Sequence, residues 1–247
     1  MRIETMTRLL LLILLLPLGA HAAGGQEPPL DRAPIDIRDA ASIQRGAQVF
    51  VNYCLNCHSA QYMRYNRLTD IGLTEKQIAD NLMFATTKVG DTMSIAAPAK
   101  AAAQWFGVAP PDLSVIARSR GADWLYSYLR SYYRDDARST GWNNTVFPNV
   151  GMPNVLWELQ GQQVLKVSEK EGAHGKEHVQ SLVLETPGTM SAPEYDRLVA
   201  DLVNYLVFMG EPMRAQRMQM GYGVLLGLAV LFVLAYLLKK EYWKDIH

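Results

Sequence analysis

The chain has 247 residues, of which 49% are hydrophobic, and its 24 Lys and Arg balance its 24 Asp and Glu, so the formal net charge is zero. Residues 23–217, which leave out the two apolar ends, hold 19 basic and 21 acidic residues. Without a basic stripe, this composition excludes a protein held on nucleic acid by positive charge, and the length is enough for one domain with a proper core.

The first 22 residues have the pattern of a secretory signal peptide. A basic start precedes an apolar run over residues 9–16, and Ala20-His21-Ala22 supplies the A-x-A ending. The run is shorter than the about 20 apolar residues that a membrane-spanning helix needs. We therefore expect cleavage after Ala22 or Ala23 and export of the mature chain, whose Pro- and Gly-rich residues 24–36 should be extended.

A helical pattern that starts near Ser42 leads into a pair of cysteines. Ile43, Ala47 and Phe50 fall on one face of this helix. The segment Cys54-Leu55-Asn56-Cys57-His58 then has the spacing C-x-x-C-H, which is typical of a c-type haem attachment site. In such a site two thiols add to the vinyl groups of haem, and the histidine can bind the iron.

Two other interpretations of the cysteine pair are weaker. A zinc site would need two further ligands, and the chain has no other cysteine. A redox dithiol would be expected near a βαβ pattern, which we do not find in the sequence. The motif therefore predicts one covalent haem c held by Cys54 and Cys57, with His58 as an iron ligand. Export agrees with this, because c-type haem is attached outside the cytoplasm.

Helical patterns continue after the motif. Thr74 and Gln77 are spaced as a capping box at the start of one helix. A short helical run passes through Ile116, and a stronger one covers residues 122–133. Gly, Asn and Pro recur at short intervals over residues 139–157, which should therefore be a loop.

Two β-rich stretches and a capped helix close the domain. Residues 164–167 and 179–184 flank a charged, glycine-containing stretch and should form a hairpin. Ser191-Ala192-Pro193-Glu194 supplies an N-cap, an early proline and an acid at the third helical position, and Gly210 and Pro212 end the helix. This helix and the one before the haem motif could pack together and frame the haem edge.

An uncharged apolar segment from Met220 to Leu238 lies near the C-terminus and is followed by two lysines. Its length suits one membrane-spanning helix, and the lysines place the tail in the cytoplasm. The predicted organisation is a signal peptide over residues 1–22, an exported haem domain over 23–217, an anchor over 218–238 and a cytoplasmic tail over 239–247.

The second axial ligand of the iron has several candidates, and a methionine thioether would favour reduced iron. Met152 and Met190 lie in loops from which a side chain could reach the iron. Met190 is favoured, because the capped helix after it fixes its position. His174 and His178 rank lower, because they lie in a Gly- and charge-rich stretch. The methionines that lie near the motif and could simply be core residues are Met63, Met83 and Met93.

In this combination the chain resembles the cytochrome c1 family, the haem subunits of the cytochrome bc1 complex (ubiquinol–cytochrome c reductase). The resemblance covers nearly all of the mature chain. P-P-D-L-S at residues 110–114 and T-P-G-T-M-S at residues 186–191, in this order ahead of one anchor, are far more specific than the haem motif. The other matching segments are residues 45–50, residues 54–58 and G-M-P at residues 151–153.

The resemblance implies that His58 and Met190 are the axial ligands and that Met152 lines or supports the haem pocket. Pro110 or Pro111 would lie near the histidine side of the haem. A backbone carbonyl there could accept the imidazole N–H and fix the tautomer. Pro111 is the residue that we assign to haem binding on this basis.

Two further side chains are implied to lie near the haem. Arg120 matches the arginine expected near a haem propionate, and Arg118 could exchange roles with it; a solvated surface charge is the alternative for both. Trp124 stands where the family tends to place an aromatic residue near the haem, and a core residue is the alternative. We find no long acidic insertion of the kind seen in some members, so docking of a soluble cytochrome should rely less on charge.

The resemblance also implies the fold and the function. The fold would be mainly α, a class I cytochrome c-like haem domain with a small β-hairpin insertion, plus one C-terminal transmembrane helix. The chain would be a one-electron carrier of the respiratory chain. It would accept an electron from the Rieske iron–sulfur protein and pass it to a c-type cytochrome. It would be no enzyme by itself, because quinol oxidation would occur in partner subunits.

The implied partners are cytochrome b, the Rieske protein, a c-type cytochrome acceptor and membrane lipid, with no nucleic acid. The expected location is a bacterial inner (plasma) membrane, crossed once, with the haem domain on the periplasmic side. Two other functions stay open. One is another membrane-anchored c-type cytochrome serving an oxidase or terminal reductase, and the other is a haem-based ligand sensor, which needs an open iron site.

Overall fold

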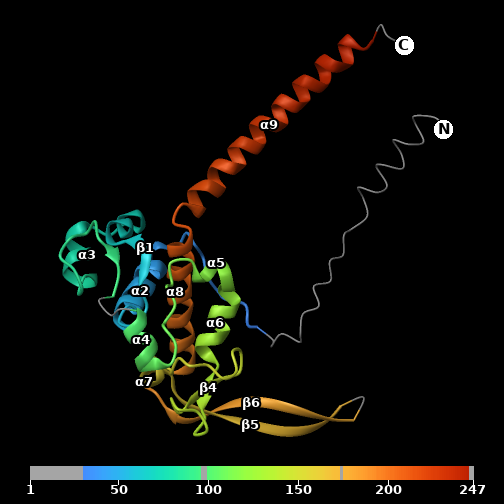
Figure 1. Cartoon of the computed structure of the whole chain (residues 1–247). Coiled ribbons are helices and arrows are strands. Elements are labelled where there is room, and N and C mark those ends of the chain that lie inside the picture. Colours follow the sequence, from blue (N-terminus) through green and yellow to red (C-terminus); the bar gives the residue numbers. More distant parts are fainter. Residues whose placement is uncertain (1–29, 96–98, 173–174, 245–247) are drawn as a thin grey trace.

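The computed structural model describes residues 30–95, 99–172 and 175–244, so the predicted signal peptide lies outside the described residues. Short helices pack around helix α8, a two-stranded hairpin projects from one end of this body, and one long helix leaves from the other end (Figure 1). The helices in chain order are α2 (Ala40–Val49), η1 (Phe50–Cys54), η2 (Tyr65–Ile71), α3 (Glu75–Leu82), α4 (Ala99–Phe106), α5 (Ile116–Arg120), α6 (Ala122–Arg130), α7 (Trp157–Gln160), α8 (Ala192–Gly210) and α9 (Arg214–Tyr242). The strands pair as three antiparallel ribbons within the described residues: β1 (Ala60–Arg64) with β2 (Thr92–Met93), β3 (Tyr132–Arg134) with β4 (Trp142–Asn144), and β5 (Gly161–Gly172) with β6 (Gly175–Pro187).

Helices α2 and α8 cross with their backbones in contact. A Cβ at Gly46 would lie 2.0 Å from the carbonyl oxygen of Asp201, so only glycine fits there. Arg45 spans the same crossing with two bonds to the Asp201 carboxylate, at 2.6 and 2.9 Å. The rings of Phe50 and Tyr205 meet with their centroids 5.3 Å apart. The predicted packing of the helix before the haem motif against the terminal helix is therefore confirmed.

We expect Gly46→Ala to lower the free energy of unfolding by roughly 1–3 kcal/mol, the usual cost of overpacking a core, because its methyl group would push α2 away from α8. This cost exceeds the about 0.5–1 kcal/mol that Ala gains over Gly inside a helix. Urea unfolding of the full-length protein in detergent measures the change. The control is Gln48→Ala, on the exposed face of the same helix. Equal stability of the two variants would contradict a tight crossing.

The helix widens just before the haem motif. Element η1 is a π-helix, in which the Leu55 N–H donates to the carbonyl of Phe50 at 2.9 Å. The N–H groups of Cys57 and His58 then both bond to the carbonyl of Cys54, at 3.1 and 2.9 Å. The predicted helix that runs into the motif is confirmed. Its widening was not predicted, although single π turns are frequent at functional sites.

Both predicted capping boxes are present. The Thr74 N–H donates to the side-chain oxygen of Gln77 at 2.9 Å, and the Gln77 N–H donates to the Thr74 hydroxyl at 3.2 Å, at the start of α3. At the start of α8 the Ser191 N–H donates to the Glu194 carboxylate at 2.9 Å. Helix α8 ends at Gly210, as predicted. Most of its side chains between Val199 and Met209 are buried in the hydrophobic core.

Helix α6 ends at Arg130, earlier than the predicted residue 133, because the chain leaves it to form a sheet. Strand β3 pairs with β4, which lies inside the residues 139–157 that we predicted to be a loop. The side-chain amide of Asn144 donates to the carbonyl of Tyr128 at 2.8 Å, and so satisfies an acceptor in the last turn of α6. The loop prediction was wrong for β4, because the asparagine that looked like a loop residue is a buried partner of the helix end.

Strands β5 and β6 form the predicted hairpin, which is longer than the sequence pattern indicated. Their register runs from Gly161 opposite Pro187 to Gly172 opposite Gly175. The pattern marked only residues 164–167 and 179–184, because apolar alternation stops in the charged stretch between them. The backbone ladder nevertheless continues through that stretch, so the ribbon projects well beyond the domain body (Figure 1).

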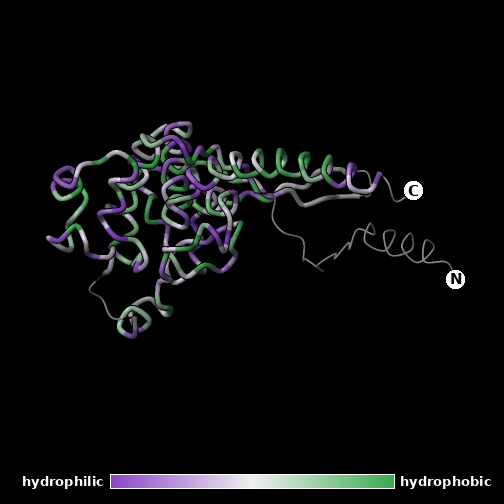
Figure 2. Tube along the Cα trace, turned by 90° about the horizontal axis from the view of Figure 1, so that it is seen from above, coloured by the Kyte–Doolittle hydropathy of each residue, from purple (hydrophilic) through white to green (hydrophobic). Residues whose placement is uncertain are grey.

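Helix α9 leaves the domain and covers the predicted anchor. It has 29 residues, and its most apolar stretch has a mean hydropathy of 2.3, which is the green length of helix in Figure 2. At about 1.5 Å per residue it is longer than the about 30 Å of a bilayer core. It begins before the predicted residue 218 and extends past 238, with Lys239 and Lys240 in its last turn. Helix α9 is therefore a candidate membrane span, as the sequence predicted.

Candidate functional site

Cys54 is the last residue of η1, Cys57 lies in the tight turn that follows it, and His58 comes directly after that turn. Cys54 and Cys57 are both free cysteines. Burial raises the pKa of the Cys54 thiol to about 12, and Cys57 acts in the same direction. His58 is only 9% exposed. One turn of chain thus supplies two thiols and one buried imidazole.

Only one ring nitrogen of His58 remains free to bind a metal. Nδ1 lies 2.8 Å from the carbonyl oxygen of Pro111, which can only accept a hydrogen bond, so Nδ1 carries the proton and Nε2 keeps its lone pair. Burial lowers the pKa of His58, while the Pro111 carbonyl and the charge of Asp112 act in the opposite direction. A neutral imidazole with a free Nε2 is the form that binds a metal. Of the two prolines considered from the sequence, Pro111 is the one whose carbonyl reaches His58.

The P-P-D-L-S loop is fixed to the segment that follows the haem motif. The Leu113 N–H donates to the carbonyl of Ser59 at 2.8 Å. The Tyr62 N–H donates to the hydroxyl of Ser114 at 3.0 Å, although the two residues are 52 apart in sequence. These bonds hold the loop where the Pro111 carbonyl meets His58.

Met190 is held between helices α7 and α8. The Thr189 N–H donates to the carbonyl of Glu158 at 2.8 Å, and the Met190 N–H donates to the carbonyl of Leu159 at 3.1 Å. Ser191, the next residue, is the N-cap of α8. The Met190 side chain is half-buried against the core. Its backbone position is therefore set from both sides.

Two glycines make this arrangement possible. Gly161 has a φ of +92°, which favours glycine, and a Cβ there would lie 2.3 Å from the carbonyl oxygen of Thr186. A Cβ at Gly188 would lie 2.3 Å from the carbonyl oxygen of Leu159. The chain before Met190 therefore crosses the end of α7 at backbone contact. Sequence reasoning missed this role of both glycines, because nothing near either one in sequence shows the crossing.

The other methionines occupy different places. Met63, Met83, Met93 and Met209 are buried in the core, with no more than 9% of any of them exposed. The Met152 sulfur accepts a hydrogen bond from the Tyr128 hydroxyl at 3.5 Å. Of the two histidine candidates, His174 lies outside the described residues, and His178 falls in strand β6 of the projecting hairpin.

Arg120 and Trp124 lie together on one aromatic stack. The Arg120 guanidinium carbon is 4.9 Å from the centre of the Trp124 ring and 5.8 Å from that of Phe147. Trp124 in turn stacks on Tyr128, with centroids 4.8 Å apart and planes 12° from parallel. Arg118 lies elsewhere, because its Cγ would be 3.3 Å from a Cβ at Gly210, at the end of α8. The two arginines are therefore not equivalent in position.

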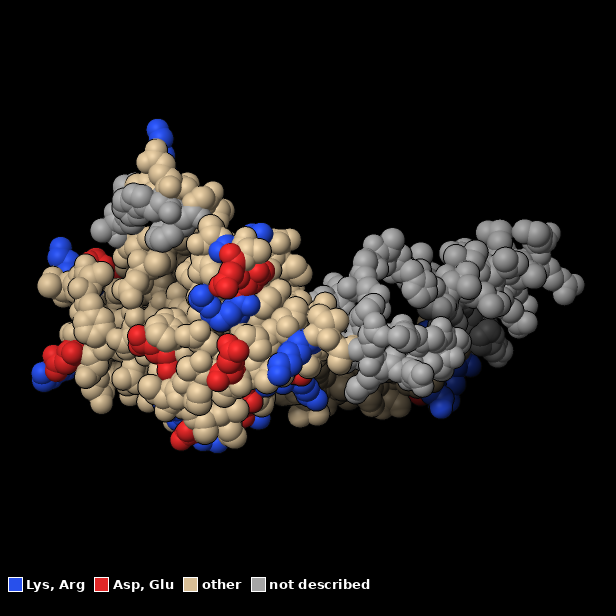
Figure 3. Space-filling model, turned by 90° about the horizontal axis from the view of Figure 1, so that it is seen from below, with Lys and Arg blue, Asp and Glu red and all other residues tan. Residues whose placement is uncertain are grey.

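Charged side chains are mixed over the surface. Figure 3 shows Lys and Arg interspersed with Asp and Glu on one face, without a large area of a single sign. Several of these charges form ion pairs, such as Arg130 with Asp31 and Asp196, at 2.6 Å each. This agrees with the near-zero charge balance of the sequence.

Comparisons with known proteins cover most of the chain. The family model described as "Cytochrome C1 family" matches residues 32–246. A protein of Allochromatium vinosum named "Cytochrome c1" is 49% identical over 236 residues, which are 95% of this chain and 96% of that protein. A Nitrosomonas europaea protein named "Ammonia monooxygenase gamma subunit" is 55% identical over 97% of both chains. The mitochondrial "Cytochrome c1, heme protein" of Saccharomyces cerevisiae is 27% identical over 86% of this chain and 70% of its own length.

Proposed function

Because the chain belongs to the cytochrome c1 family, and is therefore an electron-carrier subunit of the bc1 complex with one covalent haem c, we propose that it takes electrons from the Rieske iron–sulfur protein and passes them to a c-type cytochrome. Its neighbours in the complex are then cytochrome b and the Rieske protein. Quinol oxidation takes place in those subunits, so this chain carries electrons and is not itself the catalyst.

The residues of the haem motif fit the cofactor. Cys54 and Cys57 would hold haem through thioether bonds, and His58 would bind its iron. The observation that carries this proposal is the hydrogen bond between His58 Nδ1 and the Pro111 carbonyl, because it leaves Nε2 with a free lone pair. Bound haem supplies a one-electron iron couple, and the protein sets its potential through the ligands and the surroundings.

Met190 is the residue that we propose would bind the haem iron together with His58. Its backbone is fixed on both sides, by α7 and by the cap of α8, which suits a side chain that must reach one point. The competing loop methionine, Met152, already shares its sulfur with the Tyr128 hydroxyl. A thioether in the sixth position would close the iron to small molecules, which fits an electron carrier and not a ligand sensor.

Arg120 and Trp124 are proposed to lie at the haem edge. Arg120 is exposed and stacks on Trp124, so its charge is held in place and can balance a haem propionate. Trp124 is half-buried at the outer end of a row of aromatic rings: it stacks on Tyr128, and the ring of Tyr128 meets that of the buried Tyr132 edge-on. A residue at the rim of a cofactor pocket has this mixture of packing and exposure.

We expect Arg120→Gln to lower the midpoint potential by on the order of 59 mV, which is a tenfold change in a one-electron equilibrium. The reason is that a positive charge near the propionate favours reduced iron. A redox titration of the purified full-length protein measures the shift. Arg118→Gln is the matched control, because it removes the same charge from a neighbouring position on α5 that does not stack on Trp124. Equal shifts in both variants would show a general charge effect and count against Arg120.

The anchor and its flanks indicate the orientation in the membrane. The chain is membrane-anchored, since α9 is a candidate span and the chain belongs to the cytochrome c1 family. We infer that residues 23–217 lie on the periplasmic side of a bacterial inner membrane, because Lys239 and Lys240 follow the apolar stretch and mark the cytoplasmic end. The predicted signal peptide over residues 1–22 would start the export of the domain.

Absorption spectra of the purified protein test the haem assignment. We expect a c-type α-band after reduction and a weak sulfur-to-iron band in the near infrared of the oxidised form. A c-type spectrum without the near-infrared band would remove Met190 from the sixth position. It would also support an iron site open to small molecules or bound by histidine.

Purification from native membranes tests the partners. We expect cytochrome b and a Rieske protein to copurify with the chain, and quinol to reduce its haem within that complex. The 55% identical relative bears the name of an ammonia monooxygenase subunit. Copurification with a monooxygenase, and without cytochrome b, would contradict the proposed place in the bc1 complex.

A further inference from the structure

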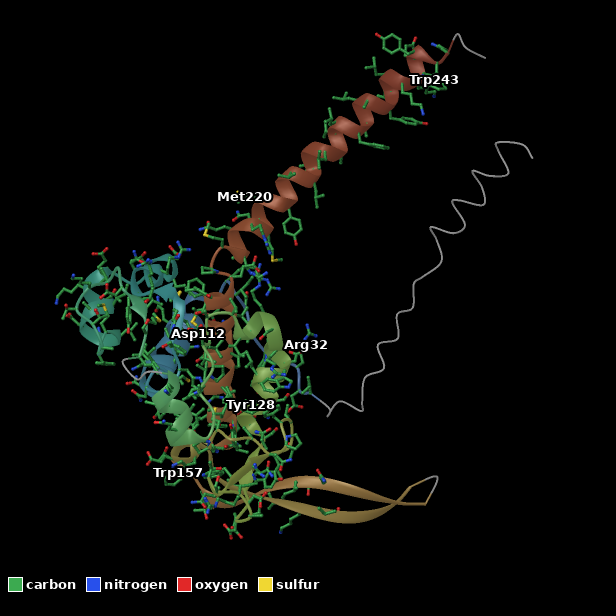
Figure 4. All side chains as sticks on the ribbon, in the orientation of Figure 1. Arg32, Asp112, Tyr128, Trp157, Met220 and Trp243 are labelled. Carbon is green, nitrogen blue, oxygen red and sulfur yellow. The ribbon has the colours of Figure 1, made fainter. Side chains whose placement is uncertain are left out.

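Asp112 joins the two chain segments that meet at His58. One oxygen of its carboxylate accepts the N–H of Gln61 at 2.9 Å, and the other accepts the N–H of Ser114 at 2.8 Å. Gln61 lies shortly after His58, and Ser114 lies in the same loop as Pro111. The carboxylate therefore bridges the donor side and the acceptor side of the His58–Pro111 hydrogen bond; Figure 4 labels Asp112 beside the strand β1 region.

The group that joins the two segments is a carboxylate, and its negative charge affects both the hydrogen bonds that it accepts and the nearby His58. A carboxylate that accepts two backbone N–H groups makes stronger bonds than a neutral acceptor would. Asp112 directly follows Pro111, whose carbonyl oxygen lies 2.8 Å from His58 Nδ1, so the carboxylate charge also lies near the imidazole. The bonds to Asp112 and its charge thus act on the same ring.

The loop does not depend on Asp112 alone for its fold. The Leu113 N–H bonds to the Ser59 carbonyl, and the Tyr62 N–H bonds to the Ser114 hydroxyl, and both bonds remain if the carboxylate is lost. Asp112 is itself exposed, and its replacement takes an acceptor only from the N–H groups of Gln61 and the buried Ser114. A variant at this position should therefore fold and bind haem.

We propose that Asp112 is a positioning residue for the histidine ligand of the haem iron. Its carboxylate holds the Pro111 carbonyl on the Nδ1–H of His58 and places a fixed negative charge next to that bond. A stronger acceptor at Nδ1 makes the imidazole a more basic ligand, which favours oxidised iron, and the negative charge has the same effect. Asp112 therefore lowers the reduction potential. This inference rests on the proposed function in one respect, because it takes His58 to be an iron ligand.

Two substitutions separate the bonds from the charge. Asp112→Asn removes the charge and keeps one oxygen acceptor, while Asp112→Ala removes the charge and both acceptors. We expect the midpoint potential of the full-length haem protein to rise in both, and to rise further in Asp112→Ala. The exchange of the His58 Nδ1–H with solvent, followed by proton NMR, should become faster in the same order. Asp136→Asn is the control, because it removes a carboxylate that is 96% exposed.

Each outcome decides the proposal. Potentials that stay at the wild-type value in both variants would overturn it. A rise in potential with unchanged Nδ1–H exchange would overturn the positioning role, because the charge alone would then explain the shift. Failure of the proposed function is visible separately, since a wild-type protein without a low-spin, histidine-ligated c-type spectrum would refute the ligand assignment before any variant is made.

Discussion

Met190→Ala is expected to abolish the near-infrared band of the oxidised protein and to lower the midpoint potential by roughly 59 mV or more. A thioether binds reduced iron in preference to oxidised iron. If the thioether binds reduced iron tenfold more tightly than oxidised iron, the midpoint potential of the one-electron couple rises by about 59 mV. Redox titration and near-infrared absorption of the purified protein measure the two effects on the same sample.

Met190→Ala should also impair electron transfer to the haem. The equilibrium between the Rieske centre and the haem falls about tenfold for every 59 mV by which the haem potential drops. Quinol-driven reduction of the haem in the complex should therefore be slow and incomplete. The haem should remain attached, because Cys54, Cys57 and His58 are unchanged.

The variant should keep the fold of the site. The bonds that fix this segment use the backbone N–H groups of Thr189 and Met190, which alanine retains. The matched control is Met152→Ala, which removes the other half-buried loop methionine and its contact with Tyr128. It should retain the near-infrared band. If Met152→Ala loses the band and Met190→Ala keeps it, the ligand assignment is reversed.

The parts of this structure that the sequence predicts are those whose chemistry is local. The capping boxes at Thr74 and Ser191 each need only residues three apart, and both are present. The haem motif and the apolar anchor are likewise continuous in sequence. These features can be predicted because each is complete within one or a few turns of chain.

The parts that the sequence does not predict depend on contacts between distant segments. The sequence pattern predicts a loop where strand β4 forms, because Asn144 gains its role only when its side chain meets α6. The choice between Pro110 and Pro111 stayed open, because the direction of a carbonyl depends on how the loop is tied to Ser59 and Tyr62. Tertiary contacts, and not local preference, decide these positions.

The crossing at Gly161 and Gly188 has the greatest consequence among these missed features. We expect Gly188→Ala to remove the near-infrared band although Met190 itself is retained. The added methyl carbon would lie 2.3 Å from the Leu159 carbonyl oxygen and 2.4 Å from the Gly161 nitrogen. Both are backbone atoms, so the methionine loop must move. The same overpacking should lower the free energy of unfolding by roughly 1–3 kcal/mol.

Near-infrared absorption and urea unfolding of Gly188→Ala test this together. Gly90→Ala is the control, because a Cβ at Gly90 meets no atom within 4 Å, and it should change neither measurement. A Gly188→Ala protein with an intact band would show that the crossing does not determine where the thioether lies. Gly188→Ala keeps every proposed ligand. Loss of the near-infrared band in this variant would therefore mean that the Met190 sulfur is displaced, and not that it is absent. The comparison with Met190→Ala therefore separates the position of the ligand from its identity.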